Sequence, residues 1–139
     1  MEVDMSTNPT VDYLHVNITS RESRESLAKM VSKLFDYWGI SSADQCALLG
    51  LAPTSRMTLN RYRKGSPFDN STDLLGRAGH LLGIHKSLRI MFPYNRDLAY
   101  RWVTAPNLRF SGKTPLEIMS NGYEGLLAVR RYLDFEQGR

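Results

Sequence analysis

The stretch SSADQCALLGLAPTSRMTLNRYRKG, residues 41–65, decides the fold that we expect for this chain. Two serines open it and can cap a helix. Gly50 ends that helix, because glycine enters the left-handed conformation at little steric cost. A second helix is expected to restart at Pro53 and to close at Gly65. Two short helices around a glycine turn predict a helix-turn-helix.

The second of these helices carries a concentrated positive charge. Between Asp44 and Asp69 there is no acidic residue, and four basic residues lie there, as many as the formal net charge of +4. At about 100° per residue, the side of this helix around Leu59 is apolar and the opposite side is polar. This division favours a DNA-reading helix over a merely solvated basic one, since Arg and Asn bond base edges and Lys bonds phosphates. The DNA-binding residues that we predict are Arg56, Asn60, Arg61, Arg63 and Lys64.

Length and composition limit the alternatives. A chain of 139 residues, 42% hydrophobic and 23% charged, is globular and can bury one ordinary core or two small ones that share helices. No apolar run approaches the roughly 20 residues of a membrane span, and no signal peptide opens the chain. The single Cys46 excludes an internal disulfide and is compatible with a reducing cytoplasm, where we expect the protein to be. A sequence pI near 9.4 favours an anionic partner.

We call residues 41–65 the anchor stretch. Before it, residues 1–20 show no sustained period of apolar residues, although residues 11–18 alternate weakly between apolar and polar residues. They could form a short strand, an arm over a partner or a disordered segment, and we expect a mostly mobile tail. A serine at position 20 or 23 then caps an amphipathic helix that Gly39 stops.

After the anchor stretch, helical periods continue to the end of the sequence. We expect a helix capped by Ser71 or Thr72 and interrupted near Gly83, with Pro93 ending its continuation. A short helix halted at Pro106, a loop at residues 107–113, a brief helix from residue 115 and a last helix over residues 123–135 follow. No sustained strand pattern is present, so we predict an all-α fold with about seven helices.

Residues for catalysis are scarce. His80 and His85 are five positions apart, which is not a shared helical face, and no carboxylate lies near enough in sequence to complete a metal set. Cys46 falls on the inner side of its helix, where a nucleophile would lack access. We therefore predict no catalytic residue, no metal and no cofactor, and a protein that is not an enzyme.

The second half contains a series of recognisable segments. They are GIHKSLRIMFP (residues 83–93), LAYRW (98–102), APN (105–107), FSGKTPLEIM (110–119) and GYEGLLAVRRYLDF (122–135). Together they resemble the C-terminal toxin-binding domain of the Xre/MbcA/ParS antitoxins. With the helix-turn-helix, the resemblance covers roughly residues 25–139. Members with this arrangement are typically partners of RES-domain toxins.

The resemblance implies a domain order and a function. It implies an Xre-like helix-turn-helix domain at residues 21–70 and an α-helical toxin-binding and dimerisation domain at residues 71–139, after the tail of residues 1–20. Such antitoxins dimerise, repress their own operon through operator DNA and cover a RES toxin that consumes NAD. The toxin-binding positions carried over are Asn107, Lys113, Arg130, Arg131 and Tyr132. The turn before the second anchor helix is expected to be longer than is usual in Xre-like proteins.

Several questions stay open at the level of sequence. Arg130 and Arg131 diverge by about 100°, so we expect one to contact the toxin without being able to say which. We expect a homodimer formed through the apolar helices between Leu74 and Trp102, and a chain ending at Asn121 that still binds DNA. A free-standing transcription regulator is the main alternative function. A small enzyme using its cysteine or histidines is a third.

Overall fold

The computed structural model describes residues 17–138, and most of the expected N-terminal tail falls outside them. In this part of the chain the secondary structure is entirely helical, as predicted. Seven α-helices occur: α2 (Arg21–Trp38), α3 (Ser42–Leu48), α4 (Arg56–Arg63), α5 (Thr72–Met91), α6 (Arg96–Arg101), α7 (Pro115–Met119) and α8 (Gly122–Gln137). Two short 3₁₀ turns, η1 (Trp102–Thr104) and η2 (Leu108–Phe110), lie between α6 and α7. No helix in residues 17–138 is long and apolar enough to cross a membrane.

The boundaries of α2 follow from its capping residues. The amide of Ser23 donates to the Ser20 hydroxyl at 3.1 Å, which makes Ser20 the N-cap. Gly39 ends the helix in the left-handed conformation, with φ of 66°. Between these caps, one face of the helix is buried, including Phe35 and Trp38. The sequence pattern thus placed both ends of this helix correctly.

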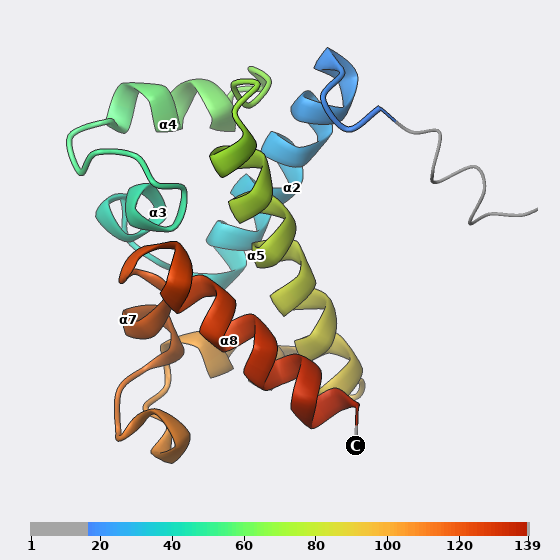
Figure 1. The fold of residues 1–139 in the computed structure, drawn as a ribbon, viewed down its shortest axis with the longest axis vertical. Coiled ribbons are helices and arrows are strands. Elements are labelled where there is room, and N and C mark those ends of the chain that lie inside the picture. The colour runs from blue at the N-terminus through green and yellow to red at the C-terminus, as the bar shows by residue number, and fades with distance from the viewer. Residues whose placement is uncertain (1–16, 139) are drawn as a thin grey trace, which may run out of the picture.

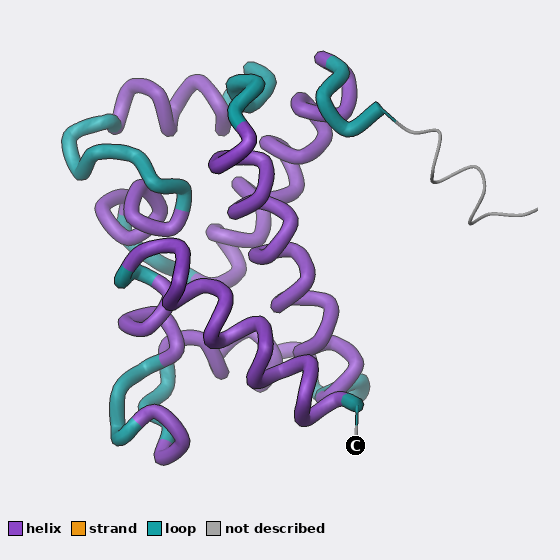
Figure 2. The backbone as a smooth tube through the Cα atoms, in the orientation of Figure 1, coloured by secondary structure: helices purple, strands orange, loops and turns teal. Residues whose placement is uncertain are grey.

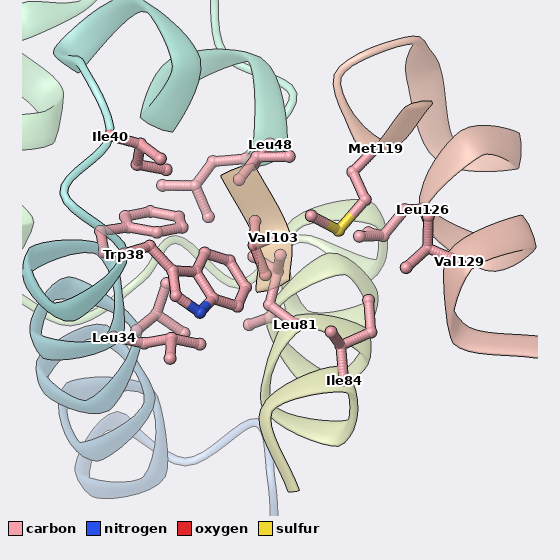
Figure 3. Close-up of a cluster of buried hydrophobic side chains, with 14 of the residues drawn as sticks. Leu34, Trp38, Ile40, Leu48, Leu81, Ile84, Val103, Met119, Leu126 and Val129 are labelled. Carbon is pink, nitrogen blue, oxygen red and sulfur yellow. The ribbon is translucent and has the colours of Figure 1, made fainter. Parts of the chain in front are cut away.

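Helices α2 and α5 are the two longest, and α8 packs along α5 in the same direction (Figure 1). Helix α5 packs against α2, α6 and α8, while α3 packs against both α4 and α8. Buried side chains from α2, α3, α5, η1, α7 and α8 meet in one continuous apolar cluster (Figure 3). Among them are Trp38, Leu81, Val103, Met119 and Leu126. The two halves of the sequence therefore share a core.

Helix α5 is continuous through Gly83, so the interruption expected there does not occur. Glycine costs a helix interior about 1 kcal/mol relative to alanine. Here its missing side chain has a packing role, because a Cβ at Gly83 would overlap the guanidinium group of Arg130 on α8. A Cβ at Gly76 would likewise overlap the hydroxyl group of Tyr123. Close approach of α8 side chains to α5 explains why these glycines lie inside a helix.

The turn between α3 and α4 differs from the expectation at its second end. Helix α4 begins at Arg56 rather than at Pro53. The amide of Ser55 donates to the Ala52 carbonyl at 2.9 Å, so Pro53 lies within a tight turn that precedes the helix. The turn spans residues 49–55 and is long, as expected, and Gly50 adopts a left-handed φ of 72°.

Helix α4 and the loop around η2 lie at opposite ends of the long axis of the molecule. In Figure 1, α4 is at the top and the loop projects at the bottom left. The tube in Figure 2 shows the helical turn of η2 between two loop segments. These two ends carry the residues that the sequence singled out for binding, apart from Arg130, Arg131 and Tyr132 of α8.

Candidate functional site

Helix α4 is divided into a buried side and an exposed side, as its sequence predicted. Leu59 and Tyr62 are buried, and Tyr62 packs edge-on against Phe68 with ring centroids 4.8 Å apart. The opposite side is in solvent, and Met57 is 83% exposed there. All five predicted DNA-binding residues, Arg56, Asn60, Arg61, Arg63 and Lys64, are exposed, with Lys64 at the C-cap. The structure therefore brings them together on one short helix and its cap.

Arg63 has a different position from the other four. Its guanidinium group forms an ion pair with Asp36 on α2 and donates to the Gln45 side-chain oxygen on α3 at 3.3 Å. Gln45 in turn donates to the carbonyl of Ile40 at 3.0 Å. Arg63 thus links α4 to α2 and α3.

The N-terminus of α4 has no side-chain cap. Ser55 is the N-cap residue, but its side chain accepts no amide hydrogen bond, and the first turn has no acidic residue. The first amide groups of a helix attract anions through their partial positive charge. The basic side chain of Arg56 lies at the same end. This end of α4 is therefore electropositive.

At the other end of the molecule, residues 107–113 form a tightly hydrogen-bonded loop. The amide of Asn107 donates to the Lys113 carbonyl, and the amide of Gly112 donates back to the Asn107 carbonyl, both at 3.0 Å. The Asn107 side chain accepts from the amide of Arg109 at 2.9 Å. Ser111 and Gly112 both take positive φ values, 57° and 84°. These contacts give the loop a defined shape.

A capping box fixes the exit of the loop into α7. The amide of Glu117 donates to the Thr114 hydroxyl at 3.0 Å, and the amide of Thr114 donates to the Glu117 carboxylate at 2.9 Å. Pro115 occupies the first turn of α7. The helix start predicted from the T-P-L-E sequence is confirmed.

An aromatic cluster lies against the loop. Trp102 and Tyr132 are stacked with ring centroids 6.3 Å apart, and Phe110 meets Tyr132 edge-on at 5.5 Å. The Arg109 guanidinium lies 5.1 Å from the centroid of the Tyr132 ring. Tyr132, which the resemblance placed at a binding site, thus connects α8 to the loop.

The two adjacent arginines of α8 have different surroundings. The Arg130 guanidinium lies 3.1 Å from His80 Nδ1 on α5 and 3.7 Å from the Asp134 carboxylate. Arg131 is exposed. Arg130 is therefore engaged within the chain, whereas Arg131 is not buried; which of them contacts a toxin stays a prediction.

His80 and His85 are partly buried and Cys46 is buried, and burial shifts the pKa of each. Burial, followed by the neighbouring Arg130, lowers the pKa of His80 below its ordinary value, and burial with Arg89 lowers the pKa of His85. Burial raises the pKa of the Cys46 thiol. No group of three or more potential metal ligands occurs within residues 17–138.

Leu108 lies in η2 and is 95% exposed. The sequence pattern predicts residues 107–113 only as a loop, in which the family resemblance picks out Asn107 and Lys113. The available signal is the asparagine cap at position 107, followed by the two apolar residues Leu108 and Phe110 ahead of Gly112.

The fold defines a class of protein: a helix-turn-helix with an exposed basic helix, joined to a second helical part that shares its core. Comparison with known families agrees and is more specific. Residues 20–83 match the antitoxin Xre-like helix-turn-helix domain, and residues 87–139 match the antitoxin Xre/MbcA/ParS C-terminal toxin-binding domain. The chain belongs to the Xre-like antitoxins.

A curated relative aligns with most of the chain. The chain is 34% identical over 107 residues to an uncharacterized protein, y4oB, from Sinorhizobium fredii (strain NBRC 101917 / NGR234). The aligned region covers 76% of this chain and 80% of that protein. The two family matches meet within α5. The boundary that we placed between residues 70 and 71 remains a prediction.

Proposed function

We propose that this chain neutralises a RES-domain toxin that consumes NAD and represses its own operon by binding operator DNA. The family supports an antitoxin with a DNA-binding domain and a toxin-binding domain. The observation that carries the proposal is the placement of an exposed basic helix and a hydrogen-bonded loop at opposite ends of one shared core (Figure 1). With this arrangement, one chain could hold DNA and a toxin together.

On the DNA side, α4 would lie in the major groove. Recognition helices present their N-terminal residues to base edges. Arg56, Asn60 and Arg61 are exposed and suited to base contacts, and Lys64 is suited to a phosphate. The uncapped N-terminus of the helix would favour an approaching phosphate group. Arg63 would contribute by holding the helix in place rather than by contacting DNA.

On the toxin side, the surface would comprise the loop and the exposed side of α8. Of the residues that the resemblance suggested, Lys113 and Arg131 are exposed, and Asn107 and Tyr132 shape the loop and its support. Arg130 would support α8 from within the chain.

A homodimer would supply two recognition helices for two half-sites about one DNA turn apart. Most apolar side chains between Leu74 and Trp102 are buried in the chain's own core or partly buried against it. Those that remain exposed are near the junction of α5 and α6, namely Ile90, Tyr94 and Leu98. We place the dimer contact there.

The proposal can be tested with the product of the adjacent reading frame. Cells expressing that product alone should stop growing, and co-expression of this chain should restore growth. The purified complex should retard DNA from upstream of the operon in a gel, and light scattering should give a mass that contains two copies of this chain. If the neighbouring product forms no complex with the chain, the proposed toxin partner is wrong.

A further inference from the structure

An exposed apolar side chain on the η2 loop raises the question of what covers it. Leu108 is 95% exposed, although leucine is among the residues most often buried. Single exposed apolar residues are common and carry no meaning alone. The relevant observation is that this one is held at a fixed position on a projecting loop (Figure 2).

The loop that carries Leu108 is ordered by its own hydrogen bonds. The Leu108 carbonyl accepts the amide of Ser111 at 3.1 Å, and the Asn107 carbonyl accepts the amides of both Phe110 and Gly112 at 3.0 Å. Binding costs free energy when a flexible segment must be ordered in the complex. Because the loop is already ordered, Leu108 can be inserted into a pocket with little of that cost.

The surroundings of Leu108 are aromatic and basic. Phe110 and Tyr132 pack beside the loop, and the Arg109 guanidinium lies over the Tyr132 ring. From residue 98 to residue 116 the chain has three basic residues and no acidic one. A complementary partner surface would present an apolar pocket bordered by carboxylates.

The exposed leucine and the positive charge around it argue against two other binding partners for this surface, namely a second copy of the chain and DNA. A second copy of this chain, joined through the same face by a two-fold axis, would bring Arg109 and Lys113 against their own equivalents, and like charges in an interface are unfavourable. DNA would meet the positive charge but offers no deep apolar pocket for a leucine. The recognition helix α4 is also at the opposite end of the molecule (Figure 1).

We infer that Leu108 is the anchor residue for the toxin, inserting into an apolar pocket that is bordered by acidic side chains, with Arg109 and Lys113 at the rim. The inference rests on the proposed function, because it takes the toxin as the partner. It adds to that function a specific residue and the chemistry of the surface that receives it. Buried anchor residues at the centre of an interface carry a large share of the binding free energy.

The test uses complexes of the full-length chain with the tagged product of the adjacent reading frame, captured on a sensor through the tag. We expect Leu108→Asp to prevent recovery of the complex or to raise its dissociation rate by about 30-fold or more, because loss of an anchor costs about 2 kcal/mol or more. Leu108→Ala should have a smaller effect in the same direction, and Leu108→Met should dissociate at nearly the wild-type rate.

A matched control is available at Ile18, an isomer of leucine that is 62% exposed just before α2. Ile18→Asp introduces the same charge and should leave the dissociation rate unchanged. All variants should retain the thermal unfolding midpoint and the DNA affinity of the wild type, since Leu108 makes little contact with the core.

The outcomes separate the inference from the function on which it rests. If the wild-type chain forms no complex, the proposed function fails, and this inference fails with it. If the wild type binds and Leu108→Asp dissociates at the wild-type rate, the function stands and Leu108 is not the anchor. Equal effects of Leu108→Asp and Ile18→Asp would overturn the inference, as would a halved mass of the free Leu108→Asp chain in light scattering, which would assign the surface to a second copy.

Discussion

The α4 surface and the η2 loop differ in what determines which of their side chains are exposed. On α4, exposed basic residues and buried apolar residues alternate with the period of a helix, so each face is defined by position in the sequence. In the loop, no period applies, and the exposed position of Leu108 depends on hydrogen bonds between residues 107–113 and on rings from η1 and α8. The sequence pattern therefore predicts the exposed face of a regular helix, whereas the exposed residues of an irregular loop are found only in the structure.

The largest expected effect concerns whether the two regions can be separated. Leu126, Val129 and Leu133 of α8 are fully buried in the shared core. Burial of each such side chain stabilises a protein by about 1.5–3 kcal/mol, against a total stability of about 5–15 kcal/mol. A chain ending at Asn121 should therefore unfold and lose DNA binding, contrary to what the sequence suggested. Circular dichroism and a gel shift of the truncated chain would check this, and a cooperative melt with retained DNA binding would contradict it.

The next effect should be confined to α4. Arg61→Ala should weaken binding to operator DNA by about 1–3 kcal/mol if the side chain reads a guanine. Lys64→Ala should weaken binding to all sequences and reduce the salt dependence by about one phosphate contact. Fluorescence anisotropy with operator and scrambled DNA at several salt concentrations would distinguish the two. Wild-type binding by the double variant would mean that α4 is not the reader.

The adjacent arginines of α8 offer a sharper comparison within one helix. Arg131→Glu should reduce toxin affinity about tenfold, or about 1.4 kcal/mol, and leave the melting temperature unchanged. Arg130→Glu should lower the melting temperature, because it removes the contact with His80 and places a carboxylate near Asp134. Calorimetric melts and dissociation rates of both variants would measure this. The reverse pattern would assign the toxin contact to Arg130.

A smaller effect is expected at Arg63. Arg63→Ala should lower the free energy of unfolding by about 0.5–1 kcal/mol through loss of the contacts with Asp36 and Gln45, since this arginine is partly exposed. Its specific DNA affinity should fall less than that of Arg61→Ala. Urea denaturation and anisotropy would provide both numbers. A loss of affinity equal to that of Arg61→Ala, without a loss of stability, would return Arg63 to the DNA surface.

The smallest effect concerns pH. His80 and His85 have pKa values lowered by burial and by neighbouring arginines, so the unfolded state binds more protons near pH 6. Their neutral forms stabilise the fold above the ordinary pKa of about 6.5, and this contribution is lost as the pH falls through the lowered values. The free energy of unfolding, measured with urea, should decline from pH 7.5 to pH 5, and the decline should be shallower in a His80→Gln, His85→Gln variant. If the wild type and the variant declined equally, the two histidines would not be the cause of the pH dependence.

The sequence by itself determined the helical class, most helix boundaries and the two faces of α4. These properties depend on neighbours one to four positions away, such as the Ser20 cap, the Gly39 stop and the Thr114–Glu117 box. The sequence motifs also carried the resemblance to the Xre antitoxins, which the family comparison confirmed.

Only the tertiary structure decided which charges are free and which residues share a core. Arg63 and Arg61 are alike in sequence, and what distinguishes them is that Asp36, on another helix, lies within reach of Arg63. Gly83 would interrupt an isolated helix, but Arg130 of α8 occupies the space beside it. Contacts between segments distant in sequence depend on how the helices pack, and no local period encodes that packing.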